Sequence, residues 1–146
     1  MLPESIELQV VTPERHVLQE TVLAIEIPGK EGYLGILPGH APLITELGIG
    51  ILAYRTASGT RYLTIIEGYA EVLPDRVIVL AEISEKAEEI DVDRSRAAHD
   101  RAQKALEQQG VGTPQWQAER QAVERALVRM GAAAKAGVRT RSTREH

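Results

Sequence analysis

The sequence contains no cysteine and no phenylalanine, and it has only one tryptophan and four tyrosines among its 146 residues. Without cysteine, the chain cannot form disulfide bonds, thiolate metal sites or a cysteine nucleophile. Five aromatic side chains are too few for a platform that stacks the bases of single-stranded nucleic acid. The formal charge of −4, from 17 basic and 21 acidic residues, also disfavours binding to a polyanion such as DNA. We therefore expect no nucleic-acid partner.

Long hydrophobic runs are missing as well. No apolar stretch approaches the ~20 residues that a helix needs to cross a bilayer. Residues 1–7 include two acidic side chains and lead almost directly into a strand pattern, unlike a signal or transit peptide. We expect a chain that does not insert into a membrane and stays in the compartment where it is made. Any link to a membrane would pass through a partner.

The residues that are present divide the chain into two parts. Residues 1–84 contain 30 Ile, Leu and Val residues, whereas residues 85–146 contain 8 of them and 12 of the 18 alanines. Branched aliphatic residues favour strands, and alanine mixed with arginine, glutamate and glutamine favours helices. The sequence predicts a β domain over residues 1–84, a helical hairpin over 85–130 and a basic flexible tail over 131–146.

The first part has the pattern of short antiparallel strands. Apolar residues alternate with polar ones over 6–10 and again over 23–27, which predicts two strands with one buried face each. Turn-forming residues at 56–60 and 74–76 separate further apolar runs, and 38–42 is too rich in proline for a central strand. Turn signals at this spacing predict an antiparallel β-sandwich or a flattened barrel.

The second part has the pattern of two antiparallel helices. Asp91 can cap a first helix that runs to about Gln109, and Thr113 followed by Pro114 can start a second. The inward side of the first helix carries mainly Ala98, Ala102, Ala105 and Leu106, and the second has a heptad-like stripe of Trp116, Val123, Leu127, Met130 and Ala134, with Arg120 in the remaining position. An alanine methyl buries one carbon where leucine buries four, so at ~0.8 kcal/mol per buried CH₂ each helix holds its neighbours weakly. We expect a hairpin that can leave its docking position at modest cost.

No residue pattern for catalysis is evident. The histidines, His16, His40, His99 and His146, are scattered and form no metal-ligand motif. Neither a phosphate-binding Gly-Lys loop nor a hydrolase nucleophile elbow occurs. The Gly-rich stretch 29–35 lies between strands with no helix after it, so a surface loop is a better interpretation than a phosphate loop. We expect no metal site, no catalytic residue and no independent enzyme.

Two groups of residues nevertheless stand out. The segment Glu31–Leu43 has glycine and proline at a density that fixes the backbone and displays His40 from a rigid loop, although a purely structural crossover is the alternative. The second group lies at helical spacing on the two predicted helices: Asp91, Arg94 and Arg101 on the first, Arg125 and Arg129 on the second. If these faces pair, the guanidiniums could bind a phosphate-bearing ligand through their planar fork of donors. The alternative is solvated charge neutralised by Glu119, Glu124 and Asp100.

Several segments resemble the epsilon subunit of bacterial F-type ATP synthases. Glu31–Leu43, with its core Gly-Ile-Leu-Pro-Gly-His-Ala-Pro-Leu, resembles the family's most distinctive stretch. Residues 68–72 and 77–81 resemble its next strands, and residues 90–94, Ile-Asp-Val-Asp-Arg, resemble the motif that opens its helical hairpin. Ser95 departs from the alanine of that motif. The resemblance extends in order over roughly residues 5–130.

The resemblance implies an N-terminal β-sandwich of about ten strands, on the rotor beside the gamma subunit and above the ring of c subunits. It also implies a mobile two-helix domain that either folds on the sandwich or extends along gamma into the alpha/beta head, where it inhibits ATP hydrolysis. Such a subunit is non-catalytic; it belongs to a complex that couples proton flow to ATP synthesis from ADP and phosphate. It lies peripherally at the cytoplasmic face of the bacterial inner membrane. A stand-alone adaptor or ATP-sensing module of the same fold is the alternative, and a mitochondrial relative is disfavoured by the missing transit peptide.

The resemblance further implies two sets of site residues and no required cofactor. Some members bind regulatory ATP through the helical domain, and the matching positions here are Glu85, Asp91, Arg94, Arg101, Arg125 and Arg129. His40 matches a position that contacts gamma. Tyr33 replaces an acidic residue that contacts the c ring in some members, so the expected contact here is Glu31 together with the loop backbone at Gly32 and Tyr33.

Overall fold

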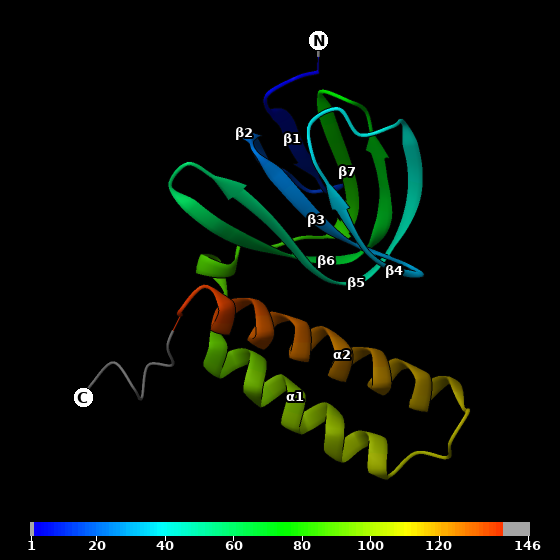
Figure 1. Ribbon diagram of the computed structural model, residues 1–146. Coiled ribbons are helices and arrows are strands. Elements are labelled where there is room, and N and C mark those ends of the chain that lie inside the picture. The colour runs from blue at the N-terminus through cyan, green and yellow to red at the C-terminus, as the bar shows by residue number, and fades with distance from the viewer. Residues whose placement is uncertain (1, 139–146) are drawn as a thin grey trace, which may run out of the picture. The chain divides into compact units, whose positions relative to one another are not determined.

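The structure, a computed structural model, describes residues 2–138 and divides into two compact units. The first unit ends at Lys86 and consists of strands, and the second begins at Ala87 and consists of helices (Figure 1). The division falls two residues beyond Ser84, because Leu63 pairs with Lys86 and so holds the chain to the strands up to that point. We call the two parts the β unit and the helical unit.

The β unit is a seven-stranded sheet wrapped around an aliphatic core. Its strands are β1 (Ile6–Val11), β2 (His16–Val22), β3 (Ala24–Gly29), β4 (Gly32–Ile36), β5 (Leu43–Thr56), β6 (Gly59–Val72) and β7 (Arg76–Ile83). They are ordered β2-β1-β7-β6-β5-β3-β4, with β1 parallel to β7 and the other neighbours antiparallel. Because β2 contacts β5 across three intervening strands, the sheet curves into a sandwich-like shape, which Figure 1 shows.

The number of strands is lower than the ten implied by the family resemblance, because two of the seven strands are long. β5 and β6 have 14 residues each and pair along almost their whole length. The ladder lacks the pair between Gly48 and Glu67, where the backbone of β6 takes φ values of 55° at Glu67 and 139° at Gly68. A Cβ atom at Gly68 would collide with the carbonyl oxygen of Leu80, so only glycine fits this bend.

Most of the predicted strand pattern is confirmed. Residues with even numbers between 6 and 10 are buried, and Ile25 and Ile27 follow the same alternation. Leu23, which the predicted alternation over 23–27 includes, instead lies between β2 and β3 and is exposed. The predicted turns are present, since two residues connect β5 to β6 and the segment 73–75 connects β6 to β7. β2 escaped prediction because polar residues interrupt its apolar alternation.

The helical unit contains a short 3₁₀ helix, η1 (Ala87–Glu89), followed by α1 (Val92–Glu107) and α2 (Pro114–Lys135). α1 and α2 pack as an antiparallel hairpin (Figure 1). Both predicted caps are confirmed: the Asp91 carboxylate accepts a hydrogen bond from the Arg94 N–H (3.1 Å), and the Thr113 hydroxyl accepts one from the Trp116 N–H (3.2 Å). Among residues 2–138, no helix is long and apolar enough to span a membrane.

Two details of the predicted helices are wrong. The predicted flexible tail began at residue 131, but α2 continues to Lys135, because alanine favours helix and Ala132 and Ala133 are buried. Residues 139–146 of that tail lie outside the described residues. In the predicted stripe of α2, Leu127 and Ala134 are exposed, whereas their neighbours Ala126 and Ala133 are buried. The fully buried positions of α2 are therefore alanines, while Trp116, Val123 and Met130 of the predicted stripe are half-buried.

Candidate functional site

The turn between β3 and β4 forms a tight tip on the β unit. Gly29 pairs with Gly32, which leaves Lys30 and Glu31 as the two residues of the turn. Lys30 is held to β5 through its N–H, which donates to the Glu46 carbonyl (2.9 Å), and through its ammonium group, 3.3 Å from the Glu46 carboxylate. Glu31 and Gly32 are exposed. The tip thus exposes the Glu31 carboxylate and Gly32, and Lys30 anchors its backbone to β5.

Tyr33 lies directly after this tip and covers part of the sheet. Its hydroxyl accepts a hydrogen bond from the Ile51 N–H (3.0 Å), while 54% of the residue remains exposed. Tyr33 and Pro28 together fill the space above Gly50, where an added Cβ would lie 2.6 Å from either side chain. The ring is therefore fixed by the sheet, and its outer face is available to a partner.

His40 belongs to a turn at the other end of β4. Leu37 to His40 form a turn in which the His40 N–H donates to the Leu37 carbonyl (3.1 Å), with Pro38 at its second position and Gly39 at φ 88°. The Gly39 N–H donates to the Pro74 carbonyl (2.8 Å), which ties the turn to the loop before β7. The His40 ring is half-buried, with Nδ1 2.7 Å from the Ala41 carbonyl oxygen. These hydrogen bonds support the predicted rigid loop, which stays a prediction.

These four predicted contact residues do not form one site. Glu31, Gly32 and Tyr33 lie at the start of β4, and His40 lies four residues beyond its end. A strand rises about 3.3 Å per residue, so the five residues of β4 separate the two ends by more than 10 Å. They can serve two separate contacts on the same unit.

The predicted ATP-binding residues at α1 differ in whether their side chains already make a hydrogen bond or an ion pair. The Asp91 carboxylate is engaged as the N-cap of α1. Arg94 and Arg101 are exposed, and their side chains have no ion pair within residues 2–138. Seven residues correspond to about two helical turns, so both lie on one face of α1, roughly 10 Å apart along its axis.

The arginines of α2 are more enclosed. Arg125 is half-buried, and its Nε is buried without a hydrogen-bond partner in the described part of the chain. Arg129, also half-buried, lies one turn further along α2. In an antiparallel hairpin, the second half of α2 runs beside the first half of α1, so Arg125 and Arg129 belong to the same end of the hairpin as Arg94. Two of the suggested counter-ions are occupied elsewhere: Glu124 pairs with Arg120 (3.8 Å) and Asp100 with His99 (3.2 Å).

Glu85 lies in the β unit, whereas the other five predicted ATP-binding residues lie in the helical unit. Its N–H donates to the Thr64 hydroxyl (3.0 Å), and its carbonyl accepts from the Thr64 N–H (2.9 Å). The backbone at Glu85 is thus fixed to β6, immediately before the helical unit begins.

An apolar patch that the sequence pattern did not predict lies on the outer face of the sheet, and we call it the outer patch. It comprises Val11, Ile44, Tyr69, Ile78 and Leu80, which occupy neighbouring rows across β1, β7, β6 and β5. Ile44 is 72% exposed, and Tyr69 and Leu80 are each 56% exposed. A pocket of about 390 Å³ opens beside Tyr69 and Leu80. The uninterrupted apolar run 77–80 was the available signal, because a strand with one solvated face should alternate.

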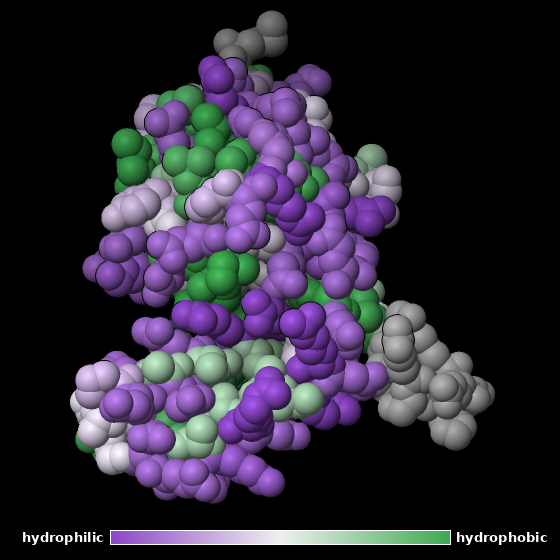
Figure 2. All heavy atoms as spheres, turned by 180° about the vertical axis from the view of Figure 1, so that it is seen from behind, coloured by the Kyte–Doolittle hydropathy of each residue, from purple (hydrophilic) through white to green (hydrophobic). Residues whose placement is uncertain are grey.

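Figure 2 shows apolar side chains reaching the surface of the β unit in several clusters. On the same view the surface of the helical unit is mainly hydrophilic, interrupted by the pale colour of weakly hydrophobic residues. No group of three or more His, Asp or Glu residues suited to a metal ion occurs within residues 2–138. Exposed apolar patches of this kind mark surfaces that bind other proteins.

Comparisons with known proteins cover nearly the whole chain. The family model described as ATP synthase, Delta/Epsilon chain, beta-sandwich domain matches residues 5–87, and the long alpha-helix domain of the same chain matches residues 88–134. The ATP synthase epsilon chain of Koribacter versatilis is 50% identical over 109 residues, which cover 75% of this chain and 77% of the relative. That of Trichlorobacter lovleyi is 42% identical over 135 residues, which cover 92% and 98%.

Solved structures agree in fold. A chain in the Euglena gracilis mitochondrial ATP synthase, solved with OSCP, F1 and the c-ring, superposes with a TM-score of 0.77 at 25% identity, over 95% of this chain and 84% of that one. A chain in the Tetrahymena thermophila mitochondrial ATP synthase central stalk and c-ring shares the fold, with a TM-score of 0.50 at 19% identity over 90% and 95%. The two family models match in sequence order, and one boundary falls at the division between the two units. The chain therefore belongs to the ATP synthase delta/epsilon chain family, as an epsilon chain.

Proposed function

We propose that the chain works as the epsilon subunit in the central rotor stalk of an F-type ATP synthase, where its β unit attaches to the rotor and its helical unit restrains ATP hydrolysis. The observation that carries this proposal is the match of both family domains, in order, over residues 5–134. The subunit is non-catalytic: synthesis of ATP from ADP and phosphate, driven by proton flow, belongs to the complex. Its place would be peripheral, at the cytoplasmic face of a bacterial inner membrane.

The outer patch supports a contact between the β unit and the gamma subunit. Its exposed aliphatic and aromatic side chains adjoin Glu46 on β5, and Glu71 lies between Ile78 and Ile44, so apolar and charged groups alternate as they do in many protein interfaces. His40 precedes Ile44 by four residues on a rigid loop, so the same partner could contact both. We assign gamma to this surface.

The tip between β3 and β4 supports a contact with the c ring. Glu31 supplies the exposed carboxylate, and Gly32, at φ 143°, allows close approach of another backbone. Because the tip is anchored by Lys30 and Tyr33, a partner would bind it with little loss of conformational entropy.

The helical unit supports a regulatory role in the alpha/beta head. The buried residues of α1 and α2 are small, so opening the hairpin exposes little apolar surface. Arg94 and Arg101 carry exposed positive charge, which suits an acidic surface on a partner subunit.

We place the proposed regulatory ATP at the end of the hairpin that carries Arg94, Arg125 and Arg129. Arg94, Arg125 and Arg129 would bind the phosphates, with Arg101 and the Asp91 carboxylate at the margins of the site. The buried, unpartnered Nε of Arg125 supports this assignment, because a buried donor without an acceptor is costly. Calorimetry of the whole chain with magnesium-free ATP tests it: we expect heat of binding that Arg94→Ala and Arg125→Ala each reduce at least tenfold, while Arg76→Ala, on β7, leaves it unchanged. No heat at millimolar ATP would end the ATP proposal only.

The proposed role in the complex is tested by copurification and ATPase assay. We expect the chain to form a stable complex with gamma, and the complete ATP synthase lacking residues 88–146 to hydrolyse ATP faster than the complex with the full chain. A chain that binds no gamma at micromolar concentration would favour the alternative, a stand-alone adaptor or ATP-sensing module. Unchanged hydrolysis after the deletion would remove the inhibitory role and leave the rotor attachment.

A further inference from the structure

The pairing of β3 with β5 is interrupted beside the tip between β3 and β4. Glu26 pairs with Ala53 and Gly29 with Leu47, so three steps along β3 (26 to 29) correspond to six along β5 (47 to 53). Pro28 lies in this gap, although β3 is an inner strand between β4 and β5. Proline has no N–H for a ladder, and within inner strands it is confined to such irregularities.

A backbone donor of β5 faces this gap. Two residues connect Thr56 to Gly59, so this first pair of the β5–β6 hairpin is hydrogen-bonded, and hydrogen-bonded and non-hydrogen-bonded pairs then alternate along the ladder. Ile51 and Thr64 form the fifth pair after it, which is not hydrogen-bonded, so the Ile51 N–H points away from β6 towards β3. In the described pairing, no residue of β3 lies opposite Ile51, and its N–H needs another acceptor.

The Tyr33 side chain crosses the gap from β4. Tyr33 pairs with Pro28 on β3, and its hydroxyl accepts a hydrogen bond from the Ile51 N–H (3.0 Å). The hydrogen bond that a neighbouring strand would normally accept thus goes to a side chain from the strand beyond it. Gly50 makes room for this contact, because an added Cβ would lie 2.6 Å from the Tyr33 hydroxyl oxygen and 2.6 Å from the Pro28 Cβ. Since the φ of Gly50 lies outside the left-handed region, the lack of space, and not the backbone conformation, requires glycine there.

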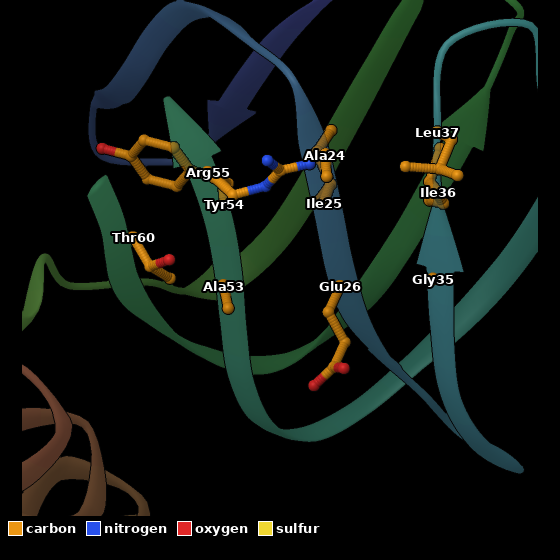
Figure 3. A pocket seen from close by; sticks show the side chains of 10 residues that line it. All are labelled: Ala24, Ile25, Glu26, Gly35, Ile36, Leu37, Ala53, Tyr54, Arg55 and Thr60. Atoms are coloured by element: carbon orange, nitrogen blue, oxygen red, sulfur yellow. The ribbon is translucent and has the colours of Figure 1, made fainter. Parts of the chain in front are cut away.

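Two residues further from the tip, the ladder is intact. Gly35, Glu26 and Ala53 pair in one row across β4, β3 and β5, and Figure 3 shows Glu26 between the other two. A pocket of about 420 Å³ lies at this row, because Gly35 and Ala53 carry little or no side chain. The three strands are connected there through the backbone, whereas the gap is bridged by the Tyr33 side chain.

The tip is attached to β5 from both sides of its turn. On the β3 side, the Lys30 N–H donates to the Glu46 carbonyl (2.9 Å), and the Lys30 ammonium group lies 3.3 Å from the Glu46 carboxylate. On the β4 side, the Tyr33 hydroxyl is bonded to Ile51. Glu31 lies between these two attachments. A turn held on both sides keeps Glu31 in one orientation, which reduces the conformational entropy that a partner must remove on binding.

We propose that the Tyr33 hydroxyl replaces the strand hydrogen bond missing at the gap and thereby positions the tip for the c ring, with Gly50 providing the space. Tyr33 acts through Glu31, so it is a positioning residue. This inference rests on the proposed contact between the tip and the c ring. It goes beyond that contact by naming the residues that set the orientation of the tip.

Amide hydrogen exchange of the whole chain tests the local hydrogen bond. Tyr33→Phe keeps the ring and removes the hydroxyl, so we expect the Ile51 amide to exchange at least about tenfold faster, while the Ala53 amide, in the intact row, keeps its rate. Tyr69→Phe, on the outer patch, is the matched control and should leave the exchange of Ile51 unchanged. An unchanged Ile51 rate in Tyr33→Phe would overturn the inference. Equal acceleration of Ile51 and Ala53 would also overturn it, because it would show a general loss of stability.

Binding assays with purified partners separate positioning from stability. We expect Tyr33→Phe to lower the affinity of the chain for the detergent-solubilised c ring about fivefold, because it removes a hydrogen bond that holds the tip, and to leave the affinity for gamma unchanged. Glu31→Gln tests the contact itself and should lower the affinity for the c ring as well. A loss with Glu31→Gln but not with Tyr33→Phe would overturn this inference alone. A chain that binds no c ring, or binds it equally after Glu31→Gln, would overturn the proposed contact too.

A double substitution tests the part that Gly50 plays. Gly50→Ala should displace Tyr33 and lower the affinity for the c ring to a similar extent, and adding Tyr33→Phe should then cost less than about twofold more, since the same hydrogen bond is already lost. Gly48→Ala is the matched control on β5, because its added Cβ would make ordinary contacts, the nearest 3.6 Å away at the Lys30 Cα, and it should bind as tightly as the unchanged chain. Losses that multiply in the double variant would overturn the coupling of Gly50 with Tyr33.

Discussion

In the β unit, large side chains such as Leu8, Leu52 and Ile65 have no measurable exposed surface. In α1 and α2, the buried residues are Ser95, Ala102, Ala126, Ala132 and Ala133. A leucine side chain carries three more carbons than an alanine side chain, which corresponds to about 2.4 kcal/mol of burial at ~0.8 kcal/mol per carbon. The stability of the β unit therefore depends on its core of large side chains. The stability of the helical unit depends more on hydrogen bonds at helix ends and on side-chain pairs within one helix.

The aromatic residues make this difference measurable. All four tyrosines lie in the β unit, at positions 33, 54, 62 and 69, and the single tryptophan, Trp116, lies on α2. Tyrosine absorbance therefore reports the β unit and tryptophan emission reports the helical unit. If the helical unit is less stable than the β unit, Trp116 emission will change at a lower urea concentration than tyrosine absorbance.

The largest effect is expected from a cavity in the core of the β unit. Leu52→Ala should lower the free energy of unfolding of this unit by about 2–5 kcal/mol, because Leu52 is fully buried between strands. Leu127→Ala on α2 is the matched change and should cost less than about 1 kcal/mol, because half of Leu127 is exposed. Urea unfolding followed by tyrosine absorbance and tryptophan emission measures both. Equal losses would contradict the comparison.

A pair of glycine substitutions tests the bend of the β unit. Gly68→Ala should destabilise the unit by roughly 2–3 kcal/mol, because its φ is 139° and the added methyl would meet the Leu80 carbonyl. Gly35→Ala should be neutral or stabilising by up to about 1 kcal/mol, because its backbone and surroundings accept a methyl group. Thermal unfolding read by tyrosine absorbance should separate the two by more than 5 °C. A stable Gly68→Ala variant would show that the bend does not need glycine.

A smaller effect is expected from the helix caps. Thr113→Ala removes the acceptor for the Trp116 N–H and should cost the helical unit about 1 kcal/mol, while Thr113→Ser keeps the hydroxyl and should cost less than half of that. In a unit with little large-side-chain burial, this loss should shift the urea midpoint of Trp116 emission clearly. Tyrosine absorbance should not change, and a shift there would mean that the units unfold together.

The smallest effect is expected from the surface of α2. Arg120 lies 3.8 Å from the Glu124 carboxylate and 5.6 Å from the centre of the Trp116 ring. Arg120→Ala should cost about 0.5 kcal/mol at low salt, and the unchanged chain should lose part of this contribution in 1 M salt. Tryptophan emission in urea at two salt concentrations measures it. A cost above 2 kcal/mol would indicate that Arg120 is part of the core of the hairpin.

The sequence predicted those parts of the fold that depend on residues close together in the chain. The N-caps at Asp91 and Thr113, the turn at Pro74 and the alternation around Leu8 each depend on neighbours in sequence, and each is confirmed. β2 and the end of α2 were missed or shortened, because polar residues interrupt the strand and an alanine-rich end resembles a tail.

The candidate sites were harder to predict, because they depend on which residues the fold brings to one surface. Ile44, Tyr69 and Leu80 are far apart in the sequence, and no sequence pattern links them. The pairing of β5 with β6 and of β6 with β7 brings them into adjacent rows of the sheet. The position of β4 at one end of the sheet likewise follows from the strand order and not from a local sequence pattern. The family resemblance groups Glu85 with the arginines of the hairpin, and its backbone is bonded to β6 of the β unit; its part in ATP binding stays a prediction.

The parallel pairing of β1 with β7 has a consequence for synthesis of the chain. β1 is the first strand to leave the ribosome, but its parallel partner begins at Arg76, 65 residues after Val11. At about 5–20 residues per second, β1 waits roughly 3–13 s, able to pair only with β2. The helical hairpin, whose contacts are local, can form soon after its second helix emerges. The helical unit, which is made after the β unit, is thus the quicker to fold, whereas β1 depends on β7, the last strand of its own unit to be made.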